Sequence, residues 1–211
     1  MTLAPPPAQA DGARVARRAK GLLWLTVAWN SAEAVVAVGA GLLAGSVALV
    51  GFGFDSGIEI AASLAALWAL SGARAEPTLA ARDLKALRII GACFLLLAAW
   101  VLYEAAAFLV EGRAPERSVV GMALAGLSLV VMPLLVRWKR RVATRLGSGA
   151  LEAEARQTGL CACLSAILLV GLGLNAALDW WWADPVAGIA MTPIIAREGW
   201  DAIRGKTCCS V

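Results

Sequence analysis

Two acidic residues, Asp55 and Glu59, lie four positions apart in the otherwise apolar stretch GFGFDSGIEIAAS. In a helix, this spacing places both carboxylates on one face. Two close negative charges disfavour each other, and either protons or a divalent cation relieves that repulsion. The pair therefore predicts a site where protons and a metal ion exchange. The alternative is a pair of protonated acids that hydrogen-bond to neighbouring helices.

Acidic residues also occur in other apolar stretches. An ionised acid near the centre of a bilayer costs at least about 2.5–3.5 kcal/mol, so such groups normally face a cavity or a partner. The acids within the first four predicted spans are Glu33, Asp55, Glu59 and Glu104. We expect no Lys or Arg at the same depth, so these acids must be protonated or must bind a cation from outside the chain.

The composition indicates that these stretches cross a membrane. Of the 211 residues, 60% are hydrophobic and 16% are charged, whereas a soluble domain is about half apolar and a quarter charged. A helical span needs about 20 apolar residues. The predicted spans are 21–42, 46–70, 88–110, 118–136, 153–176 and 184–204. The expected fold is all-α: a polytopic membrane protein with six transmembrane helices over 18–205, a disordered cytoplasmic tail over 1–17 and a short C-terminal tail over 206–211.

The positions of the charges predict the orientation in the membrane. The chain has 19 Lys and Arg residues and a formal net charge of +4. All of the basic residues except Arg113 and Arg117 fall on one side of the predicted spans, and the positive-inside rule makes that side cytoplasmic. Both termini are therefore expected in the cytoplasm, with Trp180–Trp182 at the outer interface. Because the positive charge follows the topology, no nucleic-acid partner is expected.

The chain contains no histidine, which excludes Ser-His-Asp and Cys-His nucleophile systems, HExxH zinc proteases and His-ligated haem. No other pair of nucleophile and base stands out, so no enzyme activity is expected. The five cysteines predict no disulfide framework. Cys208 and Cys209 are candidates for metal binding or lipidation. Asp184-Pro185 is typical of a helix N-cap followed by proline at the first helical position.

The second predicted span resembles the cation diffusion facilitator family of metal transporters. The resemblance rests on Gly45-Ser46, an apolar run, and then Asp55-Ser-Gly-Ile-Glu59, in which glutamate replaces the family's second aspartate. The segment ADPVAGI resembles the start of the family's sixth span. The resemblance covers residues 18–205, and the family's usual cytoplasmic C-terminal domain is expected to be absent. It implies a homodimer that exchanges a divalent metal for protons by alternating access.

The resemblance also implies a second ligand pair in the fifth span. Counted back from ADPVAGI, this pair falls on Gln157 and Cys161, which depart from the family's usual carboxylate or imidazole ligands. The implied metal site is Asp55, Glu59, Gln157 and Cys161. Carboxylates with a thiolate favour Zn²⁺, and Mn²⁺, Fe²⁺, Co²⁺ and Cd²⁺ remain open. Cys161 is equally compatible with a small buried hydrophobe, and Gln157 with a hydrogen bond between helices.

Three further residues are candidates for supporting roles. Asn30 and Glu33 share a face of the first span, where they either extend the site or relay protons, or else simply hydrogen-bond to the second span. Ser165 continues the face of Gln157 and Cys161 and is a candidate to support the ligands from behind.

The expected function is a proton-coupled transporter that exports a divalent metal, Zn²⁺ first, across a bacterial inner membrane. Its expected partners are the lipid bilayer, the metal ion, protons and a second copy of the chain, with no permanently bound cofactor. The unusual Gln157 and Cys161 pair motivates an alternative, a non-transporting metal-binding scaffold or partner of another transporter.

Overall fold

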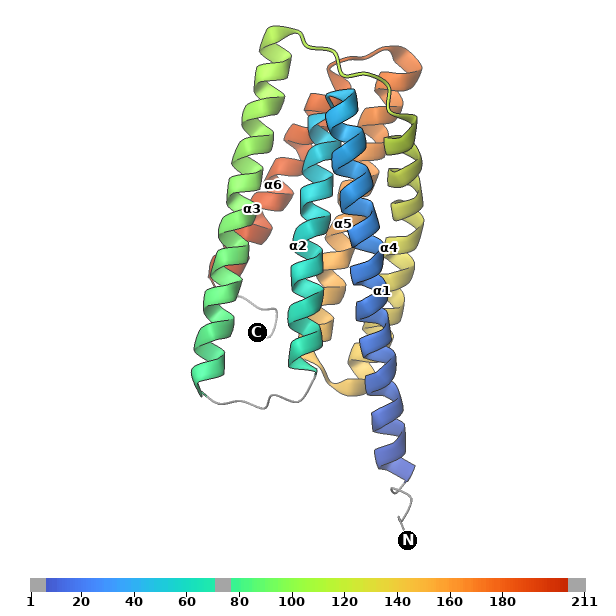
Figure 1. Ribbon diagram of the computed structural model, residues 1–211, viewed down its shortest axis with the longest axis vertical. Coiled ribbons are helices and arrows are strands. Elements are labelled where there is room, and N and C mark those ends of the chain that lie inside the picture. Colours follow the sequence, from blue (N-terminus) through green and yellow to red (C-terminus); the bar gives the residue numbers. More distant parts are fainter. Residues whose placement is uncertain (1–6, 71–76, 205–211) are drawn as a thin grey trace.

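The computed structural model describes residues 7–70 and 77–204, and within these ranges the chain is helical, with no strand. The described helices are α1 (Pro7–Ala44), α2 (Val47–Ala69), α3 (Pro77–Glu111), α4 (Val119–Leu146), α5 (Gly149–Leu178) and α6 (Ala183–Ile203). They run roughly antiparallel in sequence order, as Figure 1 shows. The predicted all-α fold is confirmed.

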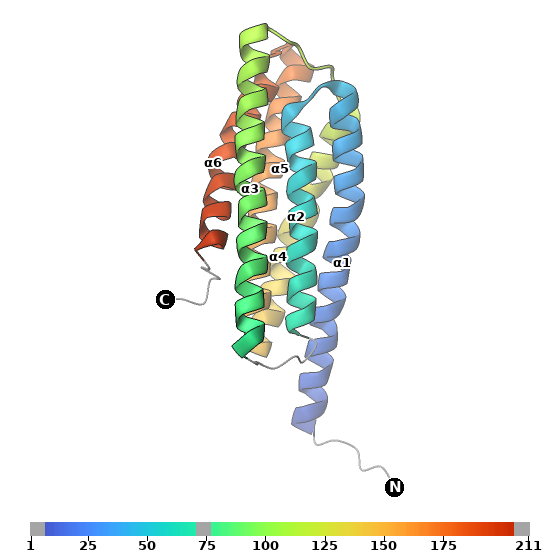
Figure 2. The same cartoon turned by 60° about the vertical axis from the view of Figure 1, so that its left-hand side comes forward.

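Four of the helices form a bundle, and the other two form a pair beside it. Helix α1 packs chiefly on α2 and α4 chiefly on α5, while contacts of α1 with α4 and of α2 with α5 close the bundle. Helix α3 packs chiefly on α6, and this pair reaches the bundle through α2 and α5 (Figures 1 and 2). The interior that can hold a buried site therefore lies between α1, α2, α4 and α5.

Glycines set the closest approaches between helices. A Cβ atom at Gly91 would lie 2.6 Å from the carbonyl oxygen of Gly199, so α3 and α6 meet backbone to backbone. Gly41 and Gly53 do the same for α1 and α2, where an added Cβ would come within 2.9 Å of a backbone nitrogen. Small residues at such crossings are typical of helices packed in a membrane.

The helices have the length and surface of membrane spans. Five of the described helices, all except α6, are long and apolar enough to cross a bilayer. Large apolar side chains such as Leu43, Leu96 and Val110 are exposed on their outer faces, as expected where lipid replaces water. Helix α6 is shorter and carries charges, including Arg197 and Glu198. The chain is thus a multi-pass membrane protein.

The start of α2 agrees with the expectations, whereas the start of α6 differs from them. Gly45 is the left-handed residue of the turn between α1 and α2, with φ of +64°, and Ser46 caps α2 by accepting a hydrogen bond from the Leu49 amide. Asp184 does not cap α6, because that helix begins one residue earlier with Trp182 at the N-cap. Instead, the Ser46 hydroxyl donates to Asp184 Oδ1 over 2.5 Å. This contact joins the start of α6 to the start of α2.

The ends of the chain are only partly described. Helix α1 begins at Pro7, so the predicted disordered tail over 1–17 is helical from residue 7 onward. Residues 1–6, Cys208 and Cys209 lie outside the described residues.

Candidate metal site

Asp55 and Glu59 lie one turn apart on the buried face of α2, inside the bundle. Asp55 is 3% exposed, and none of the described residues gives it a hydrogen bond or an ion pair. The charged groups that act on it electrostatically are the acids Glu59, Glu33 and Glu198. A buried carboxylate surrounded by acids needs a proton or a cation to offset its charge.

Glu59 is partly satisfied by α5. The Thr158 hydroxyl donates to Glu59 Oε1 over 2.6 Å, while Oε2 is buried with no hydrogen-bond partner. Cys161, one turn further along α5, is buried with its thiol facing the Glu59 carboxylate. A buried polar atom without a partner calls for an explanation such as an ion or a water. The Cys161 thiol therefore lies beside Glu59, while Asp55 lies one turn away on the same buried face of α2.

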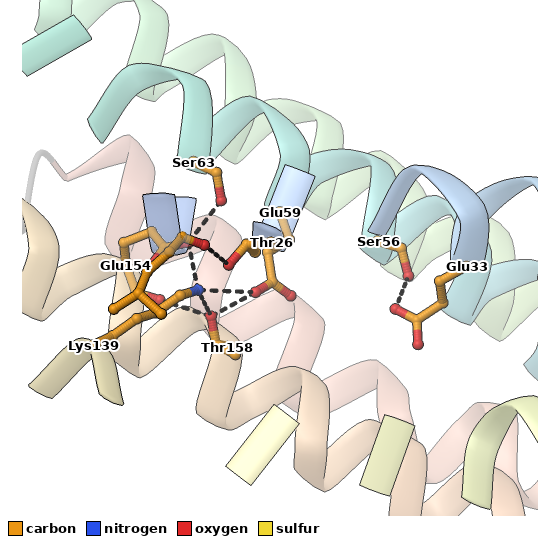
Figure 3. A network of polar contacts seen from close by, with 9 residues as sticks. Thr26, Glu33, Ser56, Glu59, Ser63, Lys139, Glu154 and Thr158 are labelled. Carbon is orange, nitrogen blue, oxygen red and sulfur yellow. Dashed lines mark hydrogen bonds and ion pairs between the residues drawn. The ribbon is translucent and has the colours of Figure 1, made fainter. Parts of the chain in front are cut away.

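A buried lysine lies beside this pair, contrary to the expectation that no basic residue reaches this depth. Helix α4 continues to Leu146, well past the predicted end of the fourth span, and the side chain of Lys139 is fully buried. Its Nζ lies 4.0 Å from Glu59 Oε1 and donates a hydrogen bond of 2.6 Å to Thr158 Oγ1. Figure 3 shows this ammonium between α4, α5 and α2.

The closest partner of Lys139 is an acid on α5. Lys139 Nζ lies 2.7 Å from Glu154 Oε1, and the Ser63 hydroxyl on α2 donates to the same oxygen over 2.6 Å (Figure 3). Glu154 is 3% exposed. One ammonium thus contacts two carboxylates, Glu154 closely and Glu59 at longer range.

A second network lies about one turn before Glu59 along α2 and centres on Glu33 of α1. The hydroxyl of Ser56 on α2 donates to Glu33 Oε2 over 2.8 Å, and the hydroxyl of Ser128 on α4 donates to Glu33 Oε1. Glu33 is therefore held by hydroxyl groups from two neighbouring helices. This contact agrees with the predicted alternative that Glu33 hydrogen-bonds to the second span.

Asn30 has a different environment from Glu33. It is fully buried, and both its Oδ1 and Nδ2 lack hydrogen-bond partners. The contact between Glu33 and Ser56 sets the register of the antiparallel helices α1 and α2. Asn30 lies about one turn before Glu33, and Glu59 lies about one turn after Ser56, so these two residues are at about the same level. Asn30 is therefore a buried amide without a hydrogen-bond partner at about the level of Glu59.

Of the predicted fifth-span pair, the structure brings only Cys161 to the site. Gln157 is half-buried, and the inward position next to it is taken by Thr158. Ser165 is buried on the same face as Cys161, but its hydroxyl donates to the Cys161 carbonyl oxygen over 2.8 Å. Among the described residues, no three Cys, Asp or Glu side chains are close enough together to hold a metal ion.

Helix phase is the signal that could have identified Lys139 and Thr158. The buried residues of α4 recur at spacings of three and four: Gly121, Ala125, Ser128, Met132, Leu135, Lys139 and Ala143. On α5, Glu154, Thr158, Cys161 and Ser165 continue such a stripe. A period of 3.6 residues makes each stripe one face of a helix. If the spacing of buried residues in the fourth span is continued past its predicted end at residue 136, Lys139 falls on the buried face of the helix.

A comparison with known families identifies this architecture. Residues 23–206 match the cation efflux transmembrane domain. The chain belongs to the cation efflux family. This match spans the described helices from within α1 to the end of α6, and it confirms the predicted resemblance to cation diffusion facilitators.

Membership of the cation efflux family, a family of transporters, makes this protein a membrane transporter of divalent metal cations. Lipid and the metal ion are accordingly its partners. No curated protein matches the sequence of this cation efflux protein.

Proposed function

We propose that this protein exchanges a divalent metal ion from the cytoplasm for protons at Asp55 and Glu59, between α2 and α5. The observation that carries the proposal is the buried, one-turn-apart carboxylate pair, in which Asp55 receives no hydrogen bond from the described residues and Glu59 Oε2 has no partner. Protons and a metal ion are alternative ways to offset these charges. Competition between them couples metal movement to proton movement.

Cys161 contributes a thiol to the proposed binding set, and Asn30 contributes an amide oxygen from α1. A thiolate with carboxylates favours Zn²⁺ or Cd²⁺, whereas oxygen ligands alone would favour Mn²⁺. Gln157 needs a rotation of α5 to join them, because Thr158 holds the inward position in this structure. Such a rotation between inward- and outward-facing states would also complete a set of ligands that is incomplete here.

Lys139 acts in this proposal as an internal cation. In this structure, its ammonium lies 4.0 Å from Glu59 Oε1 and 2.7 Å from Glu154 Oε1. A metal ion on Glu59 repels the ammonium, which keeps Glu154 as its partner. The lysine would therefore offset the charge of Glu59 whenever no metal is bound, without occupying the position beside Asp55.

A flux measurement tests the function. The purified protein is reconstituted in proteoliposomes with an imposed pH gradient, and the uptake of Zn²⁺, Cd²⁺, Mn²⁺, Fe²⁺ and Co²⁺ is followed together with luminal pH. We expect metal uptake coupled to proton counterflow in the wild type and in Glu104→Gln, and none in Asp55→Asn. Glu104 is a suitable control because it is a partly exposed acid on α3, outside the bundle.

The same measurement distinguishes the alternative function. The unusual pair of Gln157 and Cys161 in the fifth span motivates a metal-binding scaffold as the second candidate. A scaffold would bind metal at Asp55 but carry no flux, either alone or as a homodimer. Coupled flux that persists in Asp55→Asn would overturn the proposed site.

A further inference from the structure

A cavity of about 500 Å³ opens between α1 and α4 on the outside of the bundle. It lies at the end of the bundle that carries the arginines of the first part of α1 and the last part of α4, here called the basic end. Three arginines line it: Arg18 from α1, and Arg141 and Arg145 from α4. All three are exposed, and none forms an ion pair with a described residue. The cavity therefore concentrates positive charge that the described part of the protein does not neutralise.

The rest of the cavity wall is apolar. Leu22 and Leu25 follow Arg18 along α1, and Trp138 precedes Arg141 along α4. The two helices run in opposite directions. Leu22 and Leu25 on α1 and Trp138 on α4 therefore all lie nearer the middle of the membrane than the arginines do. The cavity thus has guanidinium groups at its aqueous end and two leucines toward the hydrocarbon. The Trp138 indole lies between them, as is typical of tryptophan at a membrane interface.

This polarity matches one class of ligand. A phospholipid at the inner surface places its phosphate at the level of the basic groups and its acyl chains along the apolar wall. A free phosphate would use only the arginines and would leave the leucine-lined part unexplained. We infer that this cavity binds the head group of an anionic phospholipid, in the way that basic pockets between membrane helices recognise acidic lipids.

The inference is independent of the metal site, because the cavity faces outward. Arg141 lies on the exposed side of α4, whereas Lys139 two residues earlier faces the core. The cavity residues can therefore be changed without removing a side chain of the proposed transport site.

Native mass spectrometry of the full-length protein, titrated with phosphatidylglycerol or phosphatidylcholine, tests the inference. We expect wild-type protein to retain phosphatidylglycerol in preference to phosphatidylcholine. Loss of two cavity arginines in Arg141→Gln/Arg145→Gln should lower the retention of phosphatidylglycerol roughly 30-fold. The matched control is Arg137→Gln/Arg140→Gln, which removes the same charge from exposed positions of α4 that do not line the cavity.

Three results would overturn the inference. Equal losses in the two double variants would show a general effect of charge. Equal retention of the two lipids by the wild type would show no selectivity for acidic head groups. Displacement of the lipid by inorganic phosphate at a similar concentration would assign the arginines to a free anion. Circular dichroism and size-exclusion profiles that match the wild type establish that each variant is folded.

Discussion

The ammonium of Lys139 lies 2.7 Å from Glu154 Oε1, and both side chains are buried between α4 and α5. Removing a base from a buried ion pair leaves an uncompensated acid, which typically costs about 3–5 kcal/mol. We therefore expect Lys139→Met to lower the stability of the detergent-solubilised protein strongly. Adding Glu154→Gln should recover much of the loss, because the second change removes the isolated charge. Arg140→Met, on the exposed side of α4, serves as the control.

Thermal unfolding followed by circular dichroism measures these differences. If Lys139→Met were as stable as Arg140→Met, the lysine would not be paired in the folded protein. If the double variant were no more stable than Lys139→Met, the cost would come from lost packing rather than from the uncompensated buried charge of Glu154.

Thr158 and Gln157 provide a test of which face of α5 points inward. Thr158→Val keeps the shape of the side chain but removes both the donor to Glu59 and the acceptor for Lys139. Leaving such buried groups without partners costs about 1–3 kcal/mol. Gln157→Leu should change the free energy of unfolding by less than about 0.5 kcal/mol, as is usual for a residue outside the core network.

Chemical unfolding of the two variants, with metal affinity measured in parallel, gives the comparison. A greater loss of stability in Gln157→Leu than in Thr158→Val would mean that α5 has the opposite phase in the resting protein. A loss of metal affinity in Gln157→Leu without loss of stability would place Gln157 among the ligands of another transport state.

Cys161 is the proposed soft ligand, and Cys163 is an exposed cysteine on the same helix. Cd²⁺ bound to a thiolate gives an ultraviolet charge-transfer absorption that oxygen ligands do not give. We expect this absorption in the wild type and in Cys163→Ser, and its loss in Cys161→Ser with a shift of selectivity toward Mn²⁺. Persistence of the band in Cys161→Ser would assign the thiolate ligand to another cysteine.

Ser46 has two roles where the first two helices turn. It caps α2 and donates a hydrogen bond to Asp184 at the start of α6. Ser118 caps α4 in the same way through the Gly121 amide. Loss of either cap should cost about 1 kcal/mol, and Ser46→Ala should cost about 1 kcal/mol more because a buried acid loses its partner.

Melting temperatures of Ser46→Ala and Ser118→Ala, measured in the same detergent, make this comparison. Equal destabilisation would indicate that the contact with Asp184 contributes nothing to stability. Asp184→Asn added to Ser46→Ala should reduce the difference between the two caps.

The carboxylate pair of the candidate site was predictable from the sequence because its signal is local. The spacing of Asp55 and Glu59 in an apolar stretch requires no partner to be recognised, since a helix places both on one face. Cys161 was predicted by counting back from the start of the last helix, and it does face Glu59. Gln157 came from the same count. A residue four positions from Cys161 lies on roughly the same side of the helix, but it need not be among the most buried residues of that side. Thr158 holds the buried position instead.

Lys139 shows why a charge pattern was insufficient. It belongs to a run of basic residues that predicts a cytoplasmic end, and the run as a whole does mark an exposed end of α4. Within the run, only the phase of the helix separates Lys139 from exposed neighbours such as Arg140. Its burial also requires an acid on another helix, Glu154, at the same level.

The sequence by itself determined the number of described helices, the membrane environment and the spacing of the carboxylate pair, because each depends on residues close together in the chain. The tertiary structure decided which helices enclose that pair and which side chains meet it. Helices α3 and α6 pair outside the bundle through Gly91 and Gly199, so the interior belongs to the other four. The partners of Glu59 come from α4 and α5, and only the packed register of separate helices brings them together.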